Sequence, residues 1–372
     1  MNLFAGSFLL ILLMMIELLI FKFIKKEIPW REVVYNLSSG HILMWILRAF
    51  EVLIFNFLYQ NFSLRLFDSW SFIGQWVFTF FAWDFCFYWL HRMHHKIPLF
   101  WKVHVIHHEG VHFGLSLGLR NSWYSSLSSI PFFIGLAMIG VPTAVFVSVG
   151  AVHYFVQFYN HNGIVQKSGF LENFMVTPAL HRVHHGQNLE YIDKNCGGTL
   201  NIWDRLFGTY QPELDHIEIK YGVADYIRSD NPFWANNLPF MKALHMKLPN
   251  FDKKNNYFSV PDLYIATGGL NLLNLWLFYI HCEGKNLGIQ QFWLFLLIFL
   301  GTIALGALSD NRLWGMIAWL FICFIPTALF VYSFNISHPF VLFLFILFII
   351  HGLYGLKYFG NSKSKQALSS ST

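Results

Sequence analysis

Charged residues are scarce in this chain of 372 residues: aspartate, glutamate, lysine and arginine together make up 12%. Soluble globular proteins contain about twice that share. With a hydrophobic content of 55%, this scarcity excludes both a disordered chain and an ordinary soluble domain. One soluble core cannot bury 42 phenylalanines, 14 tryptophans and 16 tyrosines besides the aliphatic residues. Much of this apolar surface must therefore face lipid.

Cysteine is scarce as well. The four cysteines, Cys86, Cys196, Cys282 and Cys323, are widely spaced and form no C-x-x-C pair. This spacing indicates neither a disulfide framework nor a thiolate metal site. The net charge of +5 comes from lysines and arginines at the ends of apolar runs rather than on one basic face, so nucleic acid is not an expected partner.

Long apolar runs, by contrast, are frequent. A membrane-spanning helix needs about 20 largely apolar residues. Seven runs meet this requirement, and we expect each to cross the bilayer: Leu3 to Ile24, Ile42 to Phe62, Phe72 to Leu90, Leu263 to His281, Ile289 to Leu308, Trp314 to Ser333 and Pro339 to Tyr354.

Basic residues suggest the orientation of these spans. Lys22, Lys25, Lys26 and Arg31 follow the first run, which places its end in the cytoplasm by the positive-inside tendency. The third span then returns the chain to the cytoplasmic face. The apolar residues 130–158 are interrupted at Gly140-Val141-Pro142, which predicts a hairpin that dips into the bilayer and returns to the same side.

Histidine is unusually frequent, with 18 residues that are concentrated in the first half of the chain. Three clusters stand out: His91-Arg92-Met93-His94-His95, His104-Val105-Ile106-His107-His108 and His181-Arg182-Val183-His184-His185. Positions three or four apart share one face of a helix, and Gln157 and His161 form a further pair of this kind. The candidate metal ligands are His91, His95, His104, His107, His108, His161, His181, His184, His185 and Gln157.

A lone histidine near a membrane surface more often places its polar ring at the lipid–water interface than binds a metal. Three clusters at ligand spacing favour metal binding, because neutral imidazole is the commonest metal ligand. Nine imidazoles exceed the four ligands of one tetrahedral site and suit two metals. Iron, zinc and copper all accept imidazole, so the residue types do not identify the metal. Two irons could activate dioxygen for attack on a lipid C–H bond, whereas zinc has no redox chemistry.

The order and spacing of the clusters resemble the fatty acid hydroxylase and sterol desaturase superfamily over residues 83–213, with Asp84-Phe85 and Tyr88-Trp89 leading into the first cluster. Three short motifs resemble its alkylglycerol monooxygenase branch: Pro178-Ala179-Leu180, Gly197-Gly198 and Trp203-Asp204-Arg205-Leu206-Phe207-Gly208-Thr209. The resemblance implies an integral membrane di-iron monooxygenase that uses dioxygen. It implies tetrahydrobiopterin as a reductant, with a small redox protein as the other possible electron donor.

The expected fold class is all-α, a multi-span membrane helical bundle with a cytoplasmic histidine-rich cap that holds two metals. We expect a catalytic membrane domain over residues 1–262 and a four-helix transmembrane bundle with a polar tail over 263–372. The expected partners are the bilayer and a lipid substrate drawn from it. The membrane would be a bacterial inner membrane or the endoplasmic reticulum.

Three alternatives stay open from the sequence. Within the superfamily, the substrate could be an alkylglycerol ether lipid, or a sterol or fatty acyl chain that is hydroxylated or desaturated. A zinc-dependent membrane hydrolase would use the same imidazoles without dioxygen. A non-enzymatic metal carrier would need histidines along a path through the spans, whereas the nine candidates all lie in the portion expected to be cytoplasmic.

Several polar residues could support the metal site from outside it. Asp84 lies two helical turns before His91, and we expect its carboxylate to accept the distal N–H of a ligand histidine. Asp193, Asn195 and Asp204 are similar candidates. Glu109, directly after the second cluster, is either an acid of the site or an exposed loop acid. Within the second span, Arg48 and Glu51 are three residues apart and should neutralise each other.

Overall fold

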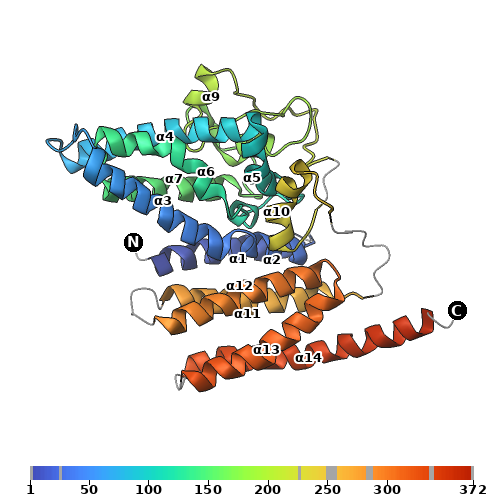
Figure 1. Cartoon of the computed structure of the whole chain (residues 1–372). Helices are drawn as coiled ribbons and strands as arrows, with labels where there is room; N and C mark the ends of the chain where they lie inside the picture. The colour runs from blue at the N-terminus through green and yellow to red at the C-terminus, as the bar shows by residue number, and fades with distance from the viewer. Residues whose placement is uncertain are drawn as a thin grey trace. The chain divides into compact units, whose positions relative to one another are not determined.

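The computed structural model describes residues 3–24, 27–224, 228–248, 258–281, 288–334 and 339–369. These residues form helices and loops without a strand, and Met175 and Leu200 make one isolated antiparallel bridge. The predicted all-helical fold class is confirmed (Figure 1). Lys25, Lys26 and Cys282 lie outside the described residues.

Contacts divide the chain into two compact units. We call Leu43–Tyr226 the histidine unit, and Met1–Ile42 together with Ile227–Thr372 the bundle unit. The sequence boundary near Asp262 lies inside the bundle unit, and the division of the chain at residue 262 stays a prediction.

The histidine unit contains six α-helices of seven or more residues and three shorter elements. They are α3 (His41–Phe62), α4 (Phe72–Lys96), α5 (Pro98–His108), η1 (Leu117–Leu119), α6 (Ser125–Ile139), α7 (Thr143–Asn160), η2 (Gly169–Asn173), α8 (Pro178–His184) and α9 (Ile202–Leu206). Helix α4 packs against α5, α6 and α7 and is the centre of this unit. Its Trp83 is buried against Phe133 of α6 and lies parallel to His153 of α7, with ring centroids 4.5 Å apart.

The bundle unit consists of α1 (Leu3–Phe23), α2 (Trp30–Ser38), α10 (Pro232–Ala243), α11 (Asp262–His281), α12 (Ile289–Ser309), α13 (Leu313–Ser333) and α14 (Pro339–Ser369). Helices α11 to α14 pack closely; a Cβ on Gly301 of α12 would lie 2.7 Å from Leu272 of α11. Small residues permit such approach where lipid supplies no hydrophobic driving force. Arg31 joins the segments around α2 by donating to the Asp262 carboxylate at 2.6 Å and to the Ser309 carbonyl at 2.7 Å.

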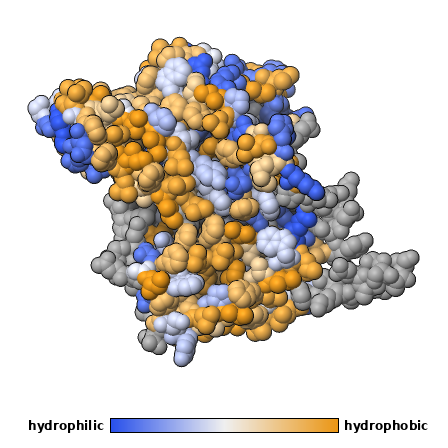
Figure 2. Space-filling model, in the orientation of Figure 1, coloured by the Kyte–Doolittle hydropathy of each residue, from blue (hydrophilic) through white to orange (hydrophobic). Residues whose placement is uncertain are grey.

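Six segments among the described residues are long and apolar enough to cross a membrane. They are Gly6–Phe23, Trp30–Phe62, Asp262–His281, Ile289–Ser309, Leu313–Ser333 and Pro339–Tyr358. These correspond to six of the seven expected spans, and the chain is a multi-pass membrane protein. On the visible face in Figure 2, hydrophobic side chains cover much of the helical surface, as lipid contact requires.

The seventh expected span, Phe72 to Leu90, is the exception. It forms the first part of α4, but α4 is not among the six segments. Gln75, Asp84 and three tryptophans lower its hydropathy, and both Trp83 and Asp84 are buried inside the histidine unit. One face of α4 therefore serves the protein core, and its crossing of the bilayer stays a prediction.

The chain reverses after α6 at Gly140, where the sequence predicted an interruption. Gly140 has a φ of 115°, a left-handed conformation that favours glycine, and it ends α6, while Pro142 precedes α7. A Cβ at Gly140 would lie 2.7 Å from the Leu66 nitrogen. The predicted break is confirmed, while the depth of this hairpin in the bilayer stays a prediction.

The two charges within α3 neutralise each other, as the sequence predicted. Arg48 donates to Glu51 at 2.5 Å, and Ser129 of α6 donates to the other carboxylate oxygen at 2.7 Å. Arg48 also lies over the ring of Tyr154. An intramembrane charge is costly unless it is paired, so this arrangement explains both residues without a catalytic role.

Candidate metal centre

Four segments of the histidine unit carry the histidines. His91 and His95 lie in the last turns of α4, the second cluster lies on α5, His161 follows the last residue of α7, and the third cluster lies on α8 and its C-cap. A sharp corner separates α4 from α5, because Ile97 is extended, as a residue before proline prefers to be, and Pro98 begins the next helix. This corner turns the second cluster back toward the first.

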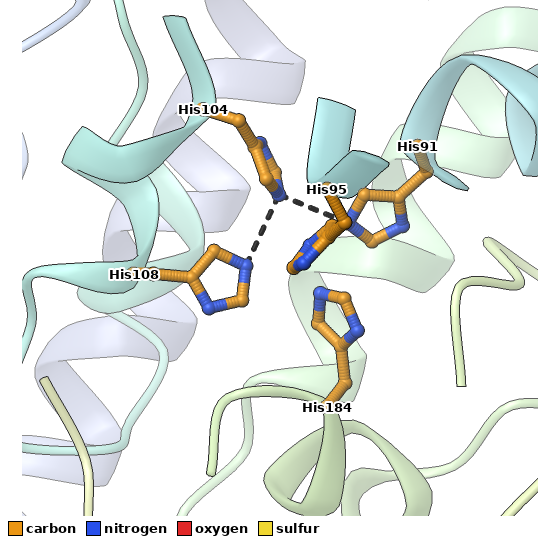
Figure 3. Close-up of side chains that lie close together, drawn as sticks. All are labelled: His91, His95, His104, His108 and His184. Carbon is orange, nitrogen blue, oxygen red and sulfur yellow. Dashed lines mark hydrogen bonds between the residues drawn. The ribbon is translucent and has the colours of Figure 1, made fainter. Parts of the chain in front are cut away.

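The side chains converge into two groups, each with potential ligand atoms that all lie within 4.8 Å of one another. The group of five contains His91, His95, His104, His108 and His184, whose rings point toward a common centre (Figure 3). The group of four contains His107, His161, His181 and His185. The two groups adjoin, because the rings of His108 and His185 stack with their centroids 4.5 Å apart. Every imidazole named as a candidate ligand belongs to one of the two groups.

Facing nitrogens within these groups are close together. His91 and His104 approach at 3.0 Å between their Nε2 atoms, and His107 and His161 approach at 3.2 Å. Two nitrogens that each bind one ion at about 2.1 Å lie about 3.0 to 3.4 Å apart when their bonds meet at right to tetrahedral angles. The observed separations therefore suit pairs of neighbouring metal ligands.

The protonation of His107 and His161 sharpens this conclusion. The Nδ1 of His107 donates to the Arg120 carbonyl at 2.8 Å, and the Nδ1 of His161 donates to the Gln157 carbonyl at 2.7 Å. A neutral imidazole carries one N–H, so both Nε2 atoms present lone pairs to each other. Two such lone pairs repel at 3.2 Å unless a proton or a metal cation lies between them, and burial, which lowers the pKa of both imidazoles, opposes the proton.

Further nitrogens are buried without a partner. Nε2 of His95, Nε2 of His184 and both ring nitrogens of His185 make no hydrogen bond. Leaving a buried polar atom unsatisfied costs about 1 to 3 kcal/mol. Because several such atoms meet in one place, the donor set fits bound metal better than a purely structural histidine core.

Burial keeps these imidazoles neutral. Desolvation is the main cause that lowers the pKa of all nine, and neighbouring imidazoles lower the pKa of most of them further. For His107 the pKa falls to about 4. Neutral imidazole is the form that binds metal, so at neutral pH these side chains could bind a metal without first losing a proton.

Backbone carbonyls hold four of the candidate ligands in position. Besides His107 and His161, the Nδ1 of His91 donates to the Cys196 carbonyl at 2.9 Å and that of His184 to the Lys194 carbonyl at 2.8 Å. Such bonds fix the tautomer and leave Nε2 free to bind. Sequence analysis missed these acceptors, because every residue has a carbonyl and no sequence signal distinguishes them.

Asp84 and Asp204 hold the loop that supplies two of these carbonyls. Asp84 accepts from the amides of Thr199 and Leu200 and from the indole of Trp203. The structure thus differs from the expectation that Asp84 binds a ligand histidine: its carboxylate satisfies buried loop amides instead. Asp204 accepts from the amides of Cys196 and Gly197 at 2.7 and 2.9 Å, directly beside the carbonyl that orients His91.

Asp193 and Asn195 occupy the same loop, both with left-handed backbone conformations. Asp193 lies 3.5 Å from Nδ1 of His95 and forms an ion pair with Lys96. His95, followed by Lys96, lowers the pKa of Asp193 to about 2. Asn195 donates to the Leu180 carbonyl in α8 and to the Gln211 carbonyl. Asp193 therefore contacts a candidate ligand, while Asn195 braces the helix that carries the third cluster.

Gln157 and His94 lie outside both groups. Gln157 contributes its carbonyl to His161, and its buried Nε2 has no hydrogen-bond partner. As a metal ligand it stays a prediction. His94, the unassigned member of the first cluster, contacts the Ser128 hydroxyl at 2.9 Å.

Glu109 is buried rather than exposed. Arg120 donates to its carboxylate at 2.5 Å and to the Ile106 carbonyl at the end of α5. Both side chains are almost completely inaccessible. This ion pair fixes the segment after α5 so that the Arg120 carbonyl meets His107.

Replacing Asp204 by asparagine should weaken metal binding. Asparagine has an NH2 group where aspartate has its second carboxylate oxygen, so one of the two loop amides would meet a donor instead of an acceptor. The loop would then shift, and the Cys196 carbonyl would no longer hold His91. Outer hydrogen-bond partners of this kind typically change metal affinity by about 10 to 100-fold. Competition with a chelator measures the change. The exposed Asp215→Asn variant should retain the parental affinity; unchanged affinity in the Asp204 variant would contradict the role assigned to this loop.

The metal-free protein should lose stability in mild acid. The folded pKa values lie below the value of about 6.5 for an unfolded histidine, so below that pH the unfolded chain binds more protons than the folded chain. Stability is thus complete above pH ~6.5 and falls toward the pKa of about 4 of His107. Thermal unfolding of chelator-treated protein between pH 7 and 5 tests this, with exposed His216→Gln as a control that should follow the parental profile. A melting temperature that does not change between pH 7 and 5 would contradict the conclusion that burial lowers the pKa of these histidines.

The fold and this site define a multi-pass membrane protein with a buried, histidine-lined candidate centre for two metals. Residues 76–209 match the family model described as fatty acid hydroxylase. The match includes all nine histidines of the two groups. The predicted resemblance is confirmed.

Three curated relatives are similar to part of the chain. An alkylglycerol monooxygenase of Xenopus tropicalis is 37% identical over 172 residues, which cover 46% of this chain and 38% of the relative. The human alkylglycerol monooxygenase is 35% identical over 176 residues, covering 47% of this chain and 38% of the relative. An ornithine lipid hydroxylase of Rhizobium tropici is 32% identical over 148 residues, covering 38% of this chain and 44% of the relative.

The chain spans less than half the length of each of these three relatives. No solved structure matches the chain with significance.

Proposed function

We propose that this protein is a membrane lipid hydroxylase that uses dioxygen and two irons. The group of five histidines would hold one iron and the group of four the other. The facing lone pairs of His107 and His161 carry this proposal, because a bound metal cation would compensate both of them, while burial lowers the pKa of both imidazoles and so opposes the extra proton that could otherwise bridge them. The match to the fatty acid hydroxylase family model, which includes both groups, supports the reaction class.

Bound iron would supply the redox chemistry that activates dioxygen. The protein's own contribution is to keep nine imidazoles neutral by burial and to fix their orientation through loop carbonyls. Overall, one substrate C–H bond becomes C–OH, one dioxygen is consumed, and two electrons and two protons from a donor reduce the second oxygen atom to water. The donor would be tetrahydrobiopterin or a small redox protein.

We infer a lipid substrate that enters from the bilayer. An apolar chain and apolar dioxygen can both reach a centre carried by membrane helices. Similarity to alkylglycerol monooxygenases favours an ether lipid. Hydroxylation of the carbon beside an ether oxygen gives a hemiacetal, which separates into an aldehyde and an alcohol.

A second candidate is hydroxylation of another membrane lipid, with an alcohol as a stable product. The similarity to an ornithine lipid hydroxylase favours it. For either substrate we propose that the centre faces the cytoplasm, as the basic residues after the first span predict.

The test is turnover by purified protein in lipid nanodiscs with iron, ¹⁸O₂ and a panel of ether lipids, acyl lipids and sterols. Mass spectrometry should find one ¹⁸O atom in the product. A fatty aldehyde identifies ether cleavage, and dependence on added tetrahydrobiopterin identifies the donor. Turnover without dioxygen, supported by zinc, would establish the hydrolase alternative. Metal transport into sealed vesicles without any lipid product would establish the carrier.

A further inference from the structure

The histidine unit exposes apolar side chains on two short elements that cannot cross a membrane. In η2, Phe170 is 77% exposed and Leu171 is exposed as well, and so is Phe174, the residue directly after η2. In α9, Leu206 is 64% exposed and Ile202 is exposed beside it. We call these five residues the η2/α9 patch. An exposed apolar cluster generally marks an interaction surface.

The patch is one surface rather than two separate tips. The side chain of Asn201, at the start of α9, donates to the carbonyls of Glu172 and Met175 at 2.7 and 3.0 Å. Its backbone amide donates to the Phe174 carbonyl at 3.0 Å. These bonds hold η2 against α9 with their apolar side chains in a fixed arrangement.

The patch continues an exposed apolar stripe on α4. Ile73, Val77, Phe81 and Phe85 recur every four residues, so they follow one slowly winding face, and all four are exposed. Phe85 then contacts Trp203 of α9 edge to face, with ring centroids 5.0 Å apart. The stripe and the patch therefore form a single apolar surface.

Cationic and aromatic side chains border this surface. Arg92 lies over the ring of Trp89, which itself contacts Phe207 at the end of α9, and Arg205 lies over Tyr210. Arginine, tryptophan and tyrosine are typical of the level of the lipid headgroups, where the cation reaches phosphate and the ring reaches the acyl boundary.

We propose that the η2/α9 patch is embedded in the headgroup and acyl boundary of the same bilayer that covers α4. The occupant of the patch is lipid. The elements are too short to span, so they lie in the interface, as monotopic segments do. Continuity with the α4 stripe selects lipid over a protein partner, and the bordering arginines complement lipid phosphates.

The position of the patch has a consequence for the candidate metal centre. In α9, the Trp203 indole donates to Asp84, and Asp204 accepts from the amides of Cys196 and Gly197. The Cys196 carbonyl in turn orients His91. Seating α9 in the interface therefore holds the histidine groups next to the membrane surface. The proposal itself does not depend on the identity of the metal or on the reaction.

Spin labels on single introduced cysteines test the proposal in proteoliposomes of phosphatidylcholine and phosphatidylglycerol. Phe170→Cys and Leu206→Cys report on the patch. Phe321→Cys, exposed on the candidate span α13, gives the lipid-facing reference, and exposed Glu190→Cys gives the water-facing reference. The parental protein supplies the background from its native cysteines. Power saturation compares collisions with dioxygen, which enters lipid, and with a polar nickel chelate, which does not.

Labels at positions 170 and 206 should resemble the label at 321, with dioxygen collisions exceeding those of the nickel chelate. Accessibility that resembles position 190 would overturn the proposal. Low accessibility to both reagents, with spin–spin broadening that disappears on dilution by unlabelled protein, would assign the patch to a second copy of the chain and would also overturn it.

Discussion

His107→Ala and His184→Ala should each reduce lipid hydroxylation to background. The two residues belong to different groups, so each substitution tests one of the two proposed irons. Each removes a neutral imidazole whose Nδ1 is held by a loop carbonyl and whose Nε2 faces the other ligands. Bound iron should fall in both variants, and expression should remain largely intact, because the histidine unit also has an extensive aromatic core.

Elemental analysis of the purified variants measures iron per chain beside the hydroxylation assay. His94→Gln is a matched control, since His94 is buried in the same cluster but lies in neither group. It should retain parental iron. Full turnover by a double variant that lacks both His107 and His184 and holds no metal would end the proposal.

Arg120→Ala should destabilise the protein strongly and weaken the group of four. Arg120 and Glu109 form an ion pair that is almost completely buried, and Arg120 also donates to the end of α5. Removing one partner of a buried pair costs about 3 to 5 kcal/mol, because the remaining charge loses its compensation. The segment that presents the Arg120 carbonyl to His107 would then lose its anchor.

Thermal unfolding and iron per chain measure both effects. The double variant Glu109→Gln with Arg120→Met removes the charges together and should recover part of the lost stability, since no buried charge remains unpaired. Arg120→Lys keeps the charge but loses the planar guanidinium and should be intermediate. An Arg120→Ala variant with parental melting temperature and iron content would show that the pair does not support the site.

The apolar runs predicted most of the helical architecture. Length and hydropathy identify six spans because a lipid-embedded segment must satisfy its own backbone hydrogen bonds, and that requirement is written in local composition. For Phe72 to Leu90, which is not among the six, a crossing of the bilayer stays a prediction. Part of that segment is buried in protein, and local composition does not distinguish a side chain that faces lipid from one that faces a neighbouring helix.

The candidate ligands could also be predicted from the sequence, whereas the contacts that support them could be predicted only in part. Spacing of three or four residues is a local property of a helix, so the nine imidazoles could be named from sequence. Asp84 could be noticed but its partners could not, because the amides of Thr199 and Leu200 lie more than a hundred residues away in the chain. The burial of Glu109 against Arg120 depends equally on how the segment after α5 turns back.

By itself the sequence determined that this is a helical membrane protein with three histidine clusters and a separate His161, because apolar length and helical periodicity are local. Only the tertiary structure decided which imidazoles share a group. The group of five takes His184 from α8, and the group of four takes His107 from α5, although each cluster is continuous in sequence. The physical reason is that neighbouring residues on a helix point in different directions, so the packing of α4, α5, α7 and α8 assigns each ring to its group.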